Sequence, residues 1–100
     1  MKPATLHEDA EAKLRQALDY YAVQRAGLDG AFRREFEAEL QRVRENPLLH
    51  AVENDDGVRY CLLRRFPYHV AYVDLEDRVW VPAVAHQRRR PRYWADRHPE

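Results

Sequence analysis

The fold is decided by residues 58–74, which read VRYCLLRRFPYHVAYVD. Val, Tyr and Leu, which favour β-strands, dominate both ends of this stretch, and Phe66-Pro67 interrupts it with a turn signal. Two strands joined by so short a break must be antiparallel, because parallel strands need a crossover of a dozen or more residues. The sequence therefore predicts strands over residues 58–65 and 68–74.

A third strand is predicted over residues 78–86. Turn residues at positions 74–77 separate it from the second strand, so the three strands form an antiparallel meander. Pro82 lies inside this third strand, and proline has no N–H group to donate to a β-ladder. We therefore expect Pro82 to lie at an edge or in a β-bulge.

The first half of the chain has apolar residues at the three- and four-residue spacing of amphipathic helices. One stripe contains Ala10, Leu14, Ala17, Leu18 and Tyr21, and a second contains Leu28, Phe32, Phe36, Leu40 and Val43. Thr5 and Glu8 fit a capping box, so the first helix should begin near Thr5. Gly27 should end it, and Asn46-Pro47 should end the second helix. The sequence predicts an α+β fold in which an antiparallel helical hairpin packs on a small sheet.

Length and composition exclude several classes of protein. The 100 residues leave room for one domain, and 45% hydrophobic with 11% aromatic residues make the chain too apolar to be disordered. Lys and Arg number 17, as do Asp and Glu, which argues against a domain that coats nucleic acid through charge alone. No apolar run approaches the roughly 20 residues that span a bilayer, and no signal-peptide core is present. We therefore expect one cytoplasmic domain without membrane association.

Cys61 is the only cysteine, so neither an internal disulfide nor a Cys-x-x-Cys metal knuckle can form. No pair of His, Asp or Glu residues has the spacing of a recognisable metal site. Cys61 itself is interpreted as a small buried hydrophobe. The sequence predicts no metal and no cofactor.

Residues 87–100 form a polar tail rich in arginine. Within it, residues 88–94 read RRRPRYW and place guanidinium groups among aromatic rings, a composition suited to phosphates and stacked bases. The alternative is that Tyr93 and Trp94 dock on the sheet, because a side chain as large as tryptophan is rarely left in water. Both interpretations stay open.

His69 and His86 are the candidates for acid–base chemistry, since each lies on or at the end of a predicted strand. An imidazole, whose ordinary pKa is about 6.5, can take a proton from a 2′-hydroxyl, as ribonuclease chemistry requires. A cleft holding His69, His86, Arg88 and Tyr93 would supply a base, an acid and charge stabilisation. The alternative is that each histidine is a hydrogen-bonded structural residue.

The order of these segments resembles the RelE/ParE superfamily of toxins from bacterial type II toxin–antitoxin systems. The matching segments are residues 10–21, which end in Tyr20-Tyr21, then residues 27–36, Asn46-Pro47, residues 59–72 and residues 83–94. The resemblance implies the order β-α-α-β-β-β in one domain over residues 1–100. The helical hairpin would cover about 8–46, the sheet about 52–86 and the basic tail 87–100. It also implies that the protein arrests growth unless an antitoxin covers it.

Members of the superfamily act by two routes, which the resemblance carries over as alternatives. RelE-like members cleave mRNA in the ribosomal A site, whereas ParE-like members bind DNA gyrase and are not nucleases. Where the nucleases have an arginine this sequence has His69, while Arg88 matches their arginine after the last strand and Tyr93 their terminal tyrosine. Their lysines are missing from residues 48–57. The nuclease set of His69, His86, Arg88 and Tyr93 is therefore incomplete.

Overall charge also separates the two routes. Proteins seated among rRNA phosphates usually have a pI above about 9, and this chain has a pI near 7.0. The leading hypothesis is therefore a non-enzymatic, ParE-like toxin that binds DNA gyrase or a similar protein. The target-binding candidates are Arg88, Arg89, Arg90, Arg92 and Trp94. The alternatives are a ribosome-dependent endoribonuclease and an inactive relative that still binds its antitoxin.

Each hypothesis implies a cognate antitoxin as partner. We expect a small, acidic, partly disordered protein that folds on the toxin by laying a helix or strand against the hairpin and sheet. Tyr20, Tyr21 and Phe36 are the candidates for this interface, and filling the core is the alternative use of the same side chains.

Overall fold

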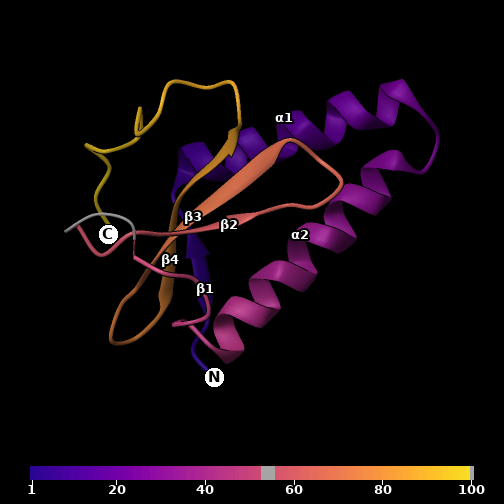
Figure 1. The fold of residues 1–100 in the computed structure, drawn as a ribbon. Helices are drawn as coiled ribbons and strands as arrows, with labels where there is room; N and C mark the ends of the chain where they lie inside the picture. The colour runs from indigo at the N-terminus through magenta and orange to yellow at the C-terminus, as the bar shows by residue number, and fades with distance from the viewer. Residues whose placement is uncertain (53–55, 100) are drawn as a thin grey trace.

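The computed structural model describes residues 1–52 and 56–99 and has the predicted α+β architecture. The elements follow the order β1 (Ala4–Leu6), α1 (Glu8–Gln24), α2 (Leu28–Glu45), β2 (Arg59–Leu62), β3 (Tyr68–Asp74) and β4 (Val79–His86). The helical hairpin lies along one side of the sheet, and the C-terminal tail lies along the other (Figure 1). Within the described residues, neither helix is long and apolar enough to cross a membrane.

The sheet contains one strand that the hydrophobic pattern did not indicate. Its order is β1-β4-β3-β2, with antiparallel β2–β3 and β3–β4 pairs and a parallel β1–β4 pair. Thr5 is paired with Trp80 in this parallel ladder, so the prediction that Thr5 caps the first helix is wrong. The cap is His7, whose Nδ1 accepts a hydrogen bond from the Asp9 amide at 3.1 Å. Thr5 is therefore part of strand β1, where its backbone pairs with β4, and it does not cap the helix.

β2 is shorter than the predicted strand over residues 58–65, and a carboxylate explains the difference. Glu35 of α2 accepts hydrogen bonds from the amides of Arg64 and Arg65 and from Arg65 Nε, the last at 3.1 Å. The amides of Arg64 and Arg65 are therefore satisfied by a side chain of the helix and not by a β-ladder. Glu35 thus fixes the β2–β3 turn against α2.

Pro82 was expected at a sheet edge or in a β-bulge, and it lies in a β-bulge of the interior strand β4. Ala71 pairs with Ala83, but Val73 pairs with Trp80, so the register shifts by one residue in β4. Tyr72 therefore opposes two residues, and the missing N–H group of Pro82 costs no ladder hydrogen bond.

The helix boundaries confirm that Asn46-Pro47 ends the second helix, whereas the first helix ends at Gln24 with Arg25 as its cap, before Gly27, which instead caps the start of α2. Gly27 has a φ of 84°, a left-handed conformation that glycine adopts without steric cost, and it joins the two helices. Asn46 caps the end of α2 directly before Pro47. Local chemistry is sufficient to place both ends of the connection.

The main core lies between the helical hairpin and the sheet, and aromatic rings meet at one end of it. The ring of Phe32 lies 4.9 Å from Phe66, 5.3 Å from Tyr68 and 5.4 Å from Tyr21, as measured between centroids. These separations fall in the range of favourable edge and offset contacts. The cluster joins α1, α2 and the β2–β3 hairpin.

Replacing Phe32 by alanine should destabilise the protein strongly. Phe32 is fully buried, and removing a buried phenylalanine ring typically costs about 3–5 kcal/mol. Chemical denaturation monitored by circular dichroism measures the change. Val23→Ala is the matched control, since Val23 is 84% exposed and its truncation should change the free energy of unfolding by less than about 0.5 kcal/mol. Equal losses in the two variants would contradict this assignment of the core.

Glu35 should make stability depend on pH. Burial raises the pKa of Glu35, but the hydrogen bonds from the side chain and amide of Arg65 and from the Arg64 amide outweigh it, so the pKa lies below its ordinary value of 4.5. A carboxyl group with a depressed folded pKa stabilises the fold above its unfolded pKa, and this contribution is lost as the pH falls through the folded value.

The difference in unfolding free energy between the wild type and Glu35→Gln should therefore shrink as the pH falls from 6 through about 4.5 and below. Urea titrations of both proteins across that range measure it. A difference that is constant with pH would show that the Glu35 hydrogen bonds do not depress its pKa.

Candidate functional site

The C-terminal tail turns back over the sheet directly after β4. The Gln87 amide donates to the Pro67 carbonyl at 2.8 Å, and the Arg88 amide donates to His86 Nδ1 at 3.0 Å. These bonds reverse the chain at the end of the β3–β4 pair, so that residues 88–97 run back across the outer face of the sheet, which we define as the face turned away from the helices.

Trp94 anchors the tail. Its side chain is 3% exposed and packs with Val58, Ala71 and Ala83 on the outer face. The sequence left open whether Trp94 binds a target or docks on the sheet, and the structure places it in the docked position. Its contribution to any binding surface is therefore indirect.

Two arginines of the tail are held by the rest of the protein. Arg92 forms an ion pair with Asp56 at 2.6 Å, and hydrogen bonds from the Val58 amide and from Arg92 lower the pKa of Asp56 despite its partial burial. Arg97 donates to the Pro82 carbonyl at 2.8 Å and lies 3.7 Å from Asp9. Both guanidinium groups fasten the tail to the outer face.

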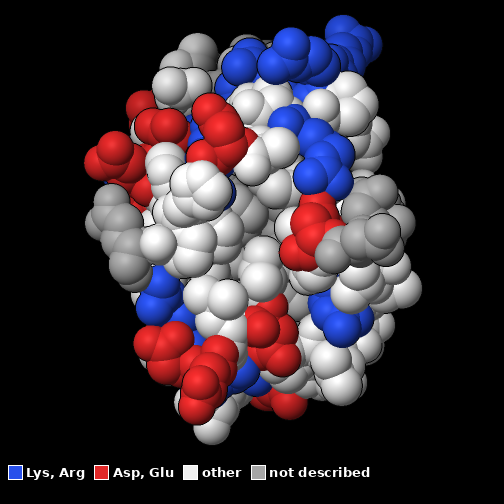
Figure 2. Space-filling view, turned by 90° about the vertical axis from the view of Figure 1, so that its left-hand side faces the viewer, with Lys and Arg blue, Asp and Glu red and all other residues white. Residues whose placement is uncertain are grey.

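Arg88, Arg89 and Arg90 are exposed and precede this anchor. Across residues 1–52 and 56–99, no ion pair involves any of the three; the guanidinium of Arg89 lies 4.3 Å from the ring centroid of Tyr93. Lys and Arg side chains gather at the upper edge of the molecule in Figure 2, the end at which Figure 1 places the start of the tail. We call residues 88–90 the arginine segment.

The predicted catalytic cleft does not form. His86 pairs with Tyr68, whose ring lies 5.2 Å away on the helix-facing side, whereas His69 pairs with Leu62 and Ala85 and belongs to the outer face. The two histidines are thus on opposite faces of the sheet. Tyr93 is also separate, because it lines a small cavity with Arg89, Arg97 and residues of α1. The expectation that His69, His86, Arg88 and Tyr93 share one cleft is therefore wrong.

His69 nevertheless lies in a cavity of the outer face, with a volume of about 370 Å³. The lining residues are Tyr60, Leu62, His69, Gln87, Arg89, Pro91 and Arg92. The ring of His69 lies edge-on to Tyr60, with centroids 5.7 Å apart. An imidazole, a phenol and two guanidinium groups thus share one hollow.

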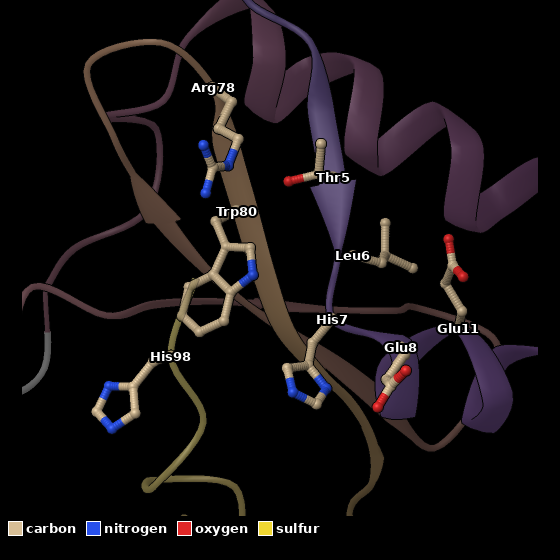
Figure 3. A pocket seen from close by; sticks show the side chains of 8 residues that line it. All are labelled: Thr5, Leu6, His7, Glu8, Glu11, Arg78, Trp80 and His98. Atoms are coloured by element: carbon tan, nitrogen blue, oxygen red, sulfur yellow. The ribbon is translucent and has the colours of Figure 1, made fainter. Parts of the chain in front are cut away.

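A second cavity of about 370 Å³ lies at the β1 edge and contains none of the predicted site residues. Figure 3 shows His7 at the start of α1, Trp80 of β4 and His98 of the tail around this hollow, with Arg78 beyond Trp80. No sequence motif indicated this cavity, because the parallel pairing of β1 with β4 brings its residues together.

The three candidates for antitoxin binding differ in exposure. Tyr20 is 57% exposed, Tyr21 is half-buried against Phe32 and Phe66, and Phe36 is 4% exposed in the main core. Burial raises the pKa of the Tyr21 phenol. Other large apolar side chains are exposed: Met1, Val23, Leu48, Leu49, Val52 and Leu62. Val52 pairs with Arg59, so some of these flank the outer edge of β2.

Glu39, His50 and Cys61 meet on the helix-facing side of β2, a cluster that the sequence analysis missed. Their carboxylate, imidazole and thiol donor atoms all lie within 4.8 Å of one another. Each lies eleven positions after the one before it, which is not the spacing of a recognisable metal-binding motif.

Comparisons with known proteins agree with this architecture. The family model described as the ParE toxin of the type II toxin–antitoxin system parDE matches residues 4–91. A solved structure described as the chromosomal ParDE toxin–antitoxin system from P. aeruginosa is similar in fold, with a TM-score of 0.67 and 19% identity, over 86% of this chain and 96% of that chain. No curated protein matches the sequence. Because the family model covers most of the chain, including both helices and all four strands, the protein belongs to the ParE toxin family of type II toxin–antitoxin systems.

Proposed function

We propose that this toxin arrests growth in the cytoplasm by binding a protein target, DNA gyrase or a similar enzyme, through the arginine segment. The observation that carries this proposal is the exposure of three adjacent arginines on a support that is fixed at both ends, by the turn after β4 and by Trp94. Arginine is enriched among the residues that contribute most to protein interfaces. An anchored segment also loses less conformational freedom on binding than a flexible tail would.

The charge distribution supports a protein target with an acidic surface. The chain has no net charge, so it lacks the overall positive field that sequence-independent binding to nucleic acid uses. In Figure 2 the largest group of Lys and Arg side chains lies at the upper edge of the face shown, whereas those lower on the face lie near Asp and Glu side chains. Such a local patch steers association with a complementary surface and fixes its orientation.

A cognate antitoxin is the second partner of the proposal. Of its three candidate contacts only Tyr20 is largely exposed, so we assign the antitoxin to Tyr20 and Val23 near the end of α1 and to the edge of β2. The β2 edge beyond Arg59, the residue with which Val52 already pairs, can accept an added strand, and the exposed leucines beside it offer apolar contacts. A partly disordered, acidic antitoxin would order itself on these surfaces.

One observation favours the alternative function of a ribosome-dependent endoribonuclease. The cavity around His69 combines an imidazole with the guanidinium group of Arg89, which could hold a phosphate beside its attacking hydroxyl. His86 lies on the other face of the sheet and could not reach a substrate in that cavity. A nuclease of this kind would therefore depend on His69 without His86.

Charge reversal in the arginine segment should weaken inhibition of gyrase. The double variant Arg88→Glu/Arg90→Glu should need a concentration about tenfold or more higher than the wild type to inhibit DNA supercoiling in vitro, because each exposed guanidinium becomes a repelling carboxylate. The matched control is Arg15→Glu, which reverses an exposed arginine on α1 and should inhibit like the wild type. Absence of inhibition by the wild-type toxin at micromolar concentration would overturn the gyrase proposal.

The nuclease alternative makes a separate prediction for mRNA. If it is correct, primer extension on translated mRNA after induction of the toxin should show new 5′ ends that disappear in His69→Ala and persist in His86→Ala. The gyrase proposal expects no new 5′ ends in any of the three strains. Growth arrest without mRNA cleavage would therefore contradict the nuclease alternative and agree with binding to a protein target.

A further inference from the structure

We propose that Glu39, His50 and Cys61 form a zinc-binding site on the helix-facing side of β2. Glu39 comes from α2, Cys61 from β2 and His50 from the segment that connects the two. A carboxylate oxygen, an imidazole nitrogen and a thiol sulfur are all ligands of Zn²⁺. The site is distinct from the arginine segment and does not depend on the proposed target.

The positions of the donor atoms suit a tetrahedral ion. Ligands about 2.0–2.3 Å from Zn²⁺ lie roughly 3.5 Å from one another. Cys61 Sγ already lies 3.1 Å from Glu39 Oε2, and all three donors are within 4.8 Å. A movement of about one ångström would complete the geometry, and His50 belongs to a connecting segment where such a movement is least costly. A water molecule would take the fourth position.

One nitrogen of the His50 ring lacks a hydrogen-bond partner within the described part of the chain. His50 Nε2 is buried and has no hydrogen-bond partner among the described residues. A buried polar atom without a partner costs free energy, and a metal ion bound to Nε2 would remove that cost. The ring of His50 is held by an edge contact with Tyr72, and Arg59 donates to the His50 carbonyl.

Charge balance explains why a divalent ion fits among these groups. Glu39 is 7% exposed, and Arg42 binds its Oε1 at 2.8 Å, which orients the carboxylate and leaves Oε2 directed at Cys61. Burial and the neighbouring Glu39 raise the pKa of Cys61 to about 12. A bound cation reverses this effect, since it stabilises the thiolate. On binding, the thiol proton is released to solvent, so Zn²⁺ would have two anionic ligands, the Cys61 thiolate and the Glu39 carboxylate.

Cobalt substitution tests the site directly. Because Cys61 is the only cysteine, a sulfur-to-cobalt charge-transfer band can arise only from its thiolate. Titration of the reduced, full-length protein with Co²⁺ should give this band at one ion per chain, and one equivalent of Zn²⁺ should abolish it. Zn²⁺ should also raise the melting temperature of the protein in a concentration-dependent way.

Variants identify the other ligands. Loss of an outer-shell partner already lowers metal affinity by about 10-fold to 100-fold, so His50→Gln and Glu39→Gln should each weaken Co²⁺ binding at least tenfold. Cys61→Ser, whose hydroxyl can still donate to Glu39, should fold but give no charge-transfer band. His69→Gln is the matched control on the outer face and should bind like the wild type. Cobalt binding without the sulfur band, an unchanged affinity in His50→Gln, or no binding at millimolar Co²⁺ would each overturn the proposal.

Discussion

Both faces of the four-stranded sheet are apolar, and the structure depends on covering both of them. The helical hairpin buries the first face with large side chains such as Phe32. On the outer face, the paired residues of β3 and β4 include two alanines, Ala71 and Ala83. Their small side chains leave space for one large, flat side chain. Trp94 covers these two alanines and packs against Val58 as well, and this contact is the buried anchor of the tail.

This contact divides the arginines of the tail by their place relative to Trp94. Arg92 and Arg97 flank the anchor and are used for fastening, through Asp56 and the Pro82 carbonyl. The arginine segment lies between the end of β4 and the anchor, and its three side chains remain in solvent. The arginines of the tail thus have two roles: Arg92 and Arg97 hold the tail on the protein, and residues 88–90 are accessible to a partner. The bulge at Pro82 contributes to this division because it frees the carbonyl that Arg97 uses.

Sequence reasoning succeeded where the signal is local and failed where it depends on register or on contacts between distant segments. Gly27, Asn46-Pro47 and Pro82 each act on their own backbone, so their effects could be predicted. Thr5 could not be placed, because its partner Trp80 is far away in the sequence. The separation of His69 from His86 required the register of the β3–β4 pair, since a shift by one residue moves every side chain to the other face.

The alternation of side chains along β2 also keeps the two candidate sites apart. Cys61 faces the helices beside Glu39, whereas its neighbours Tyr60 and Leu62 face the tail and line the cavity of His69. Glu39 is the single charged side chain that is buried among the described residues, in a core that is otherwise apolar. A carboxylate in such surroundings needs compensation: Arg42, which is half exposed, supplies a positive charge at Oε1, whereas Oε2 accepts a hydrogen bond from the uncharged Cys61 thiol. An ion held at the other oxygen would join α2 to β2 and strengthen the scaffold from the helix side, without contacting the arginine segment on the opposite face.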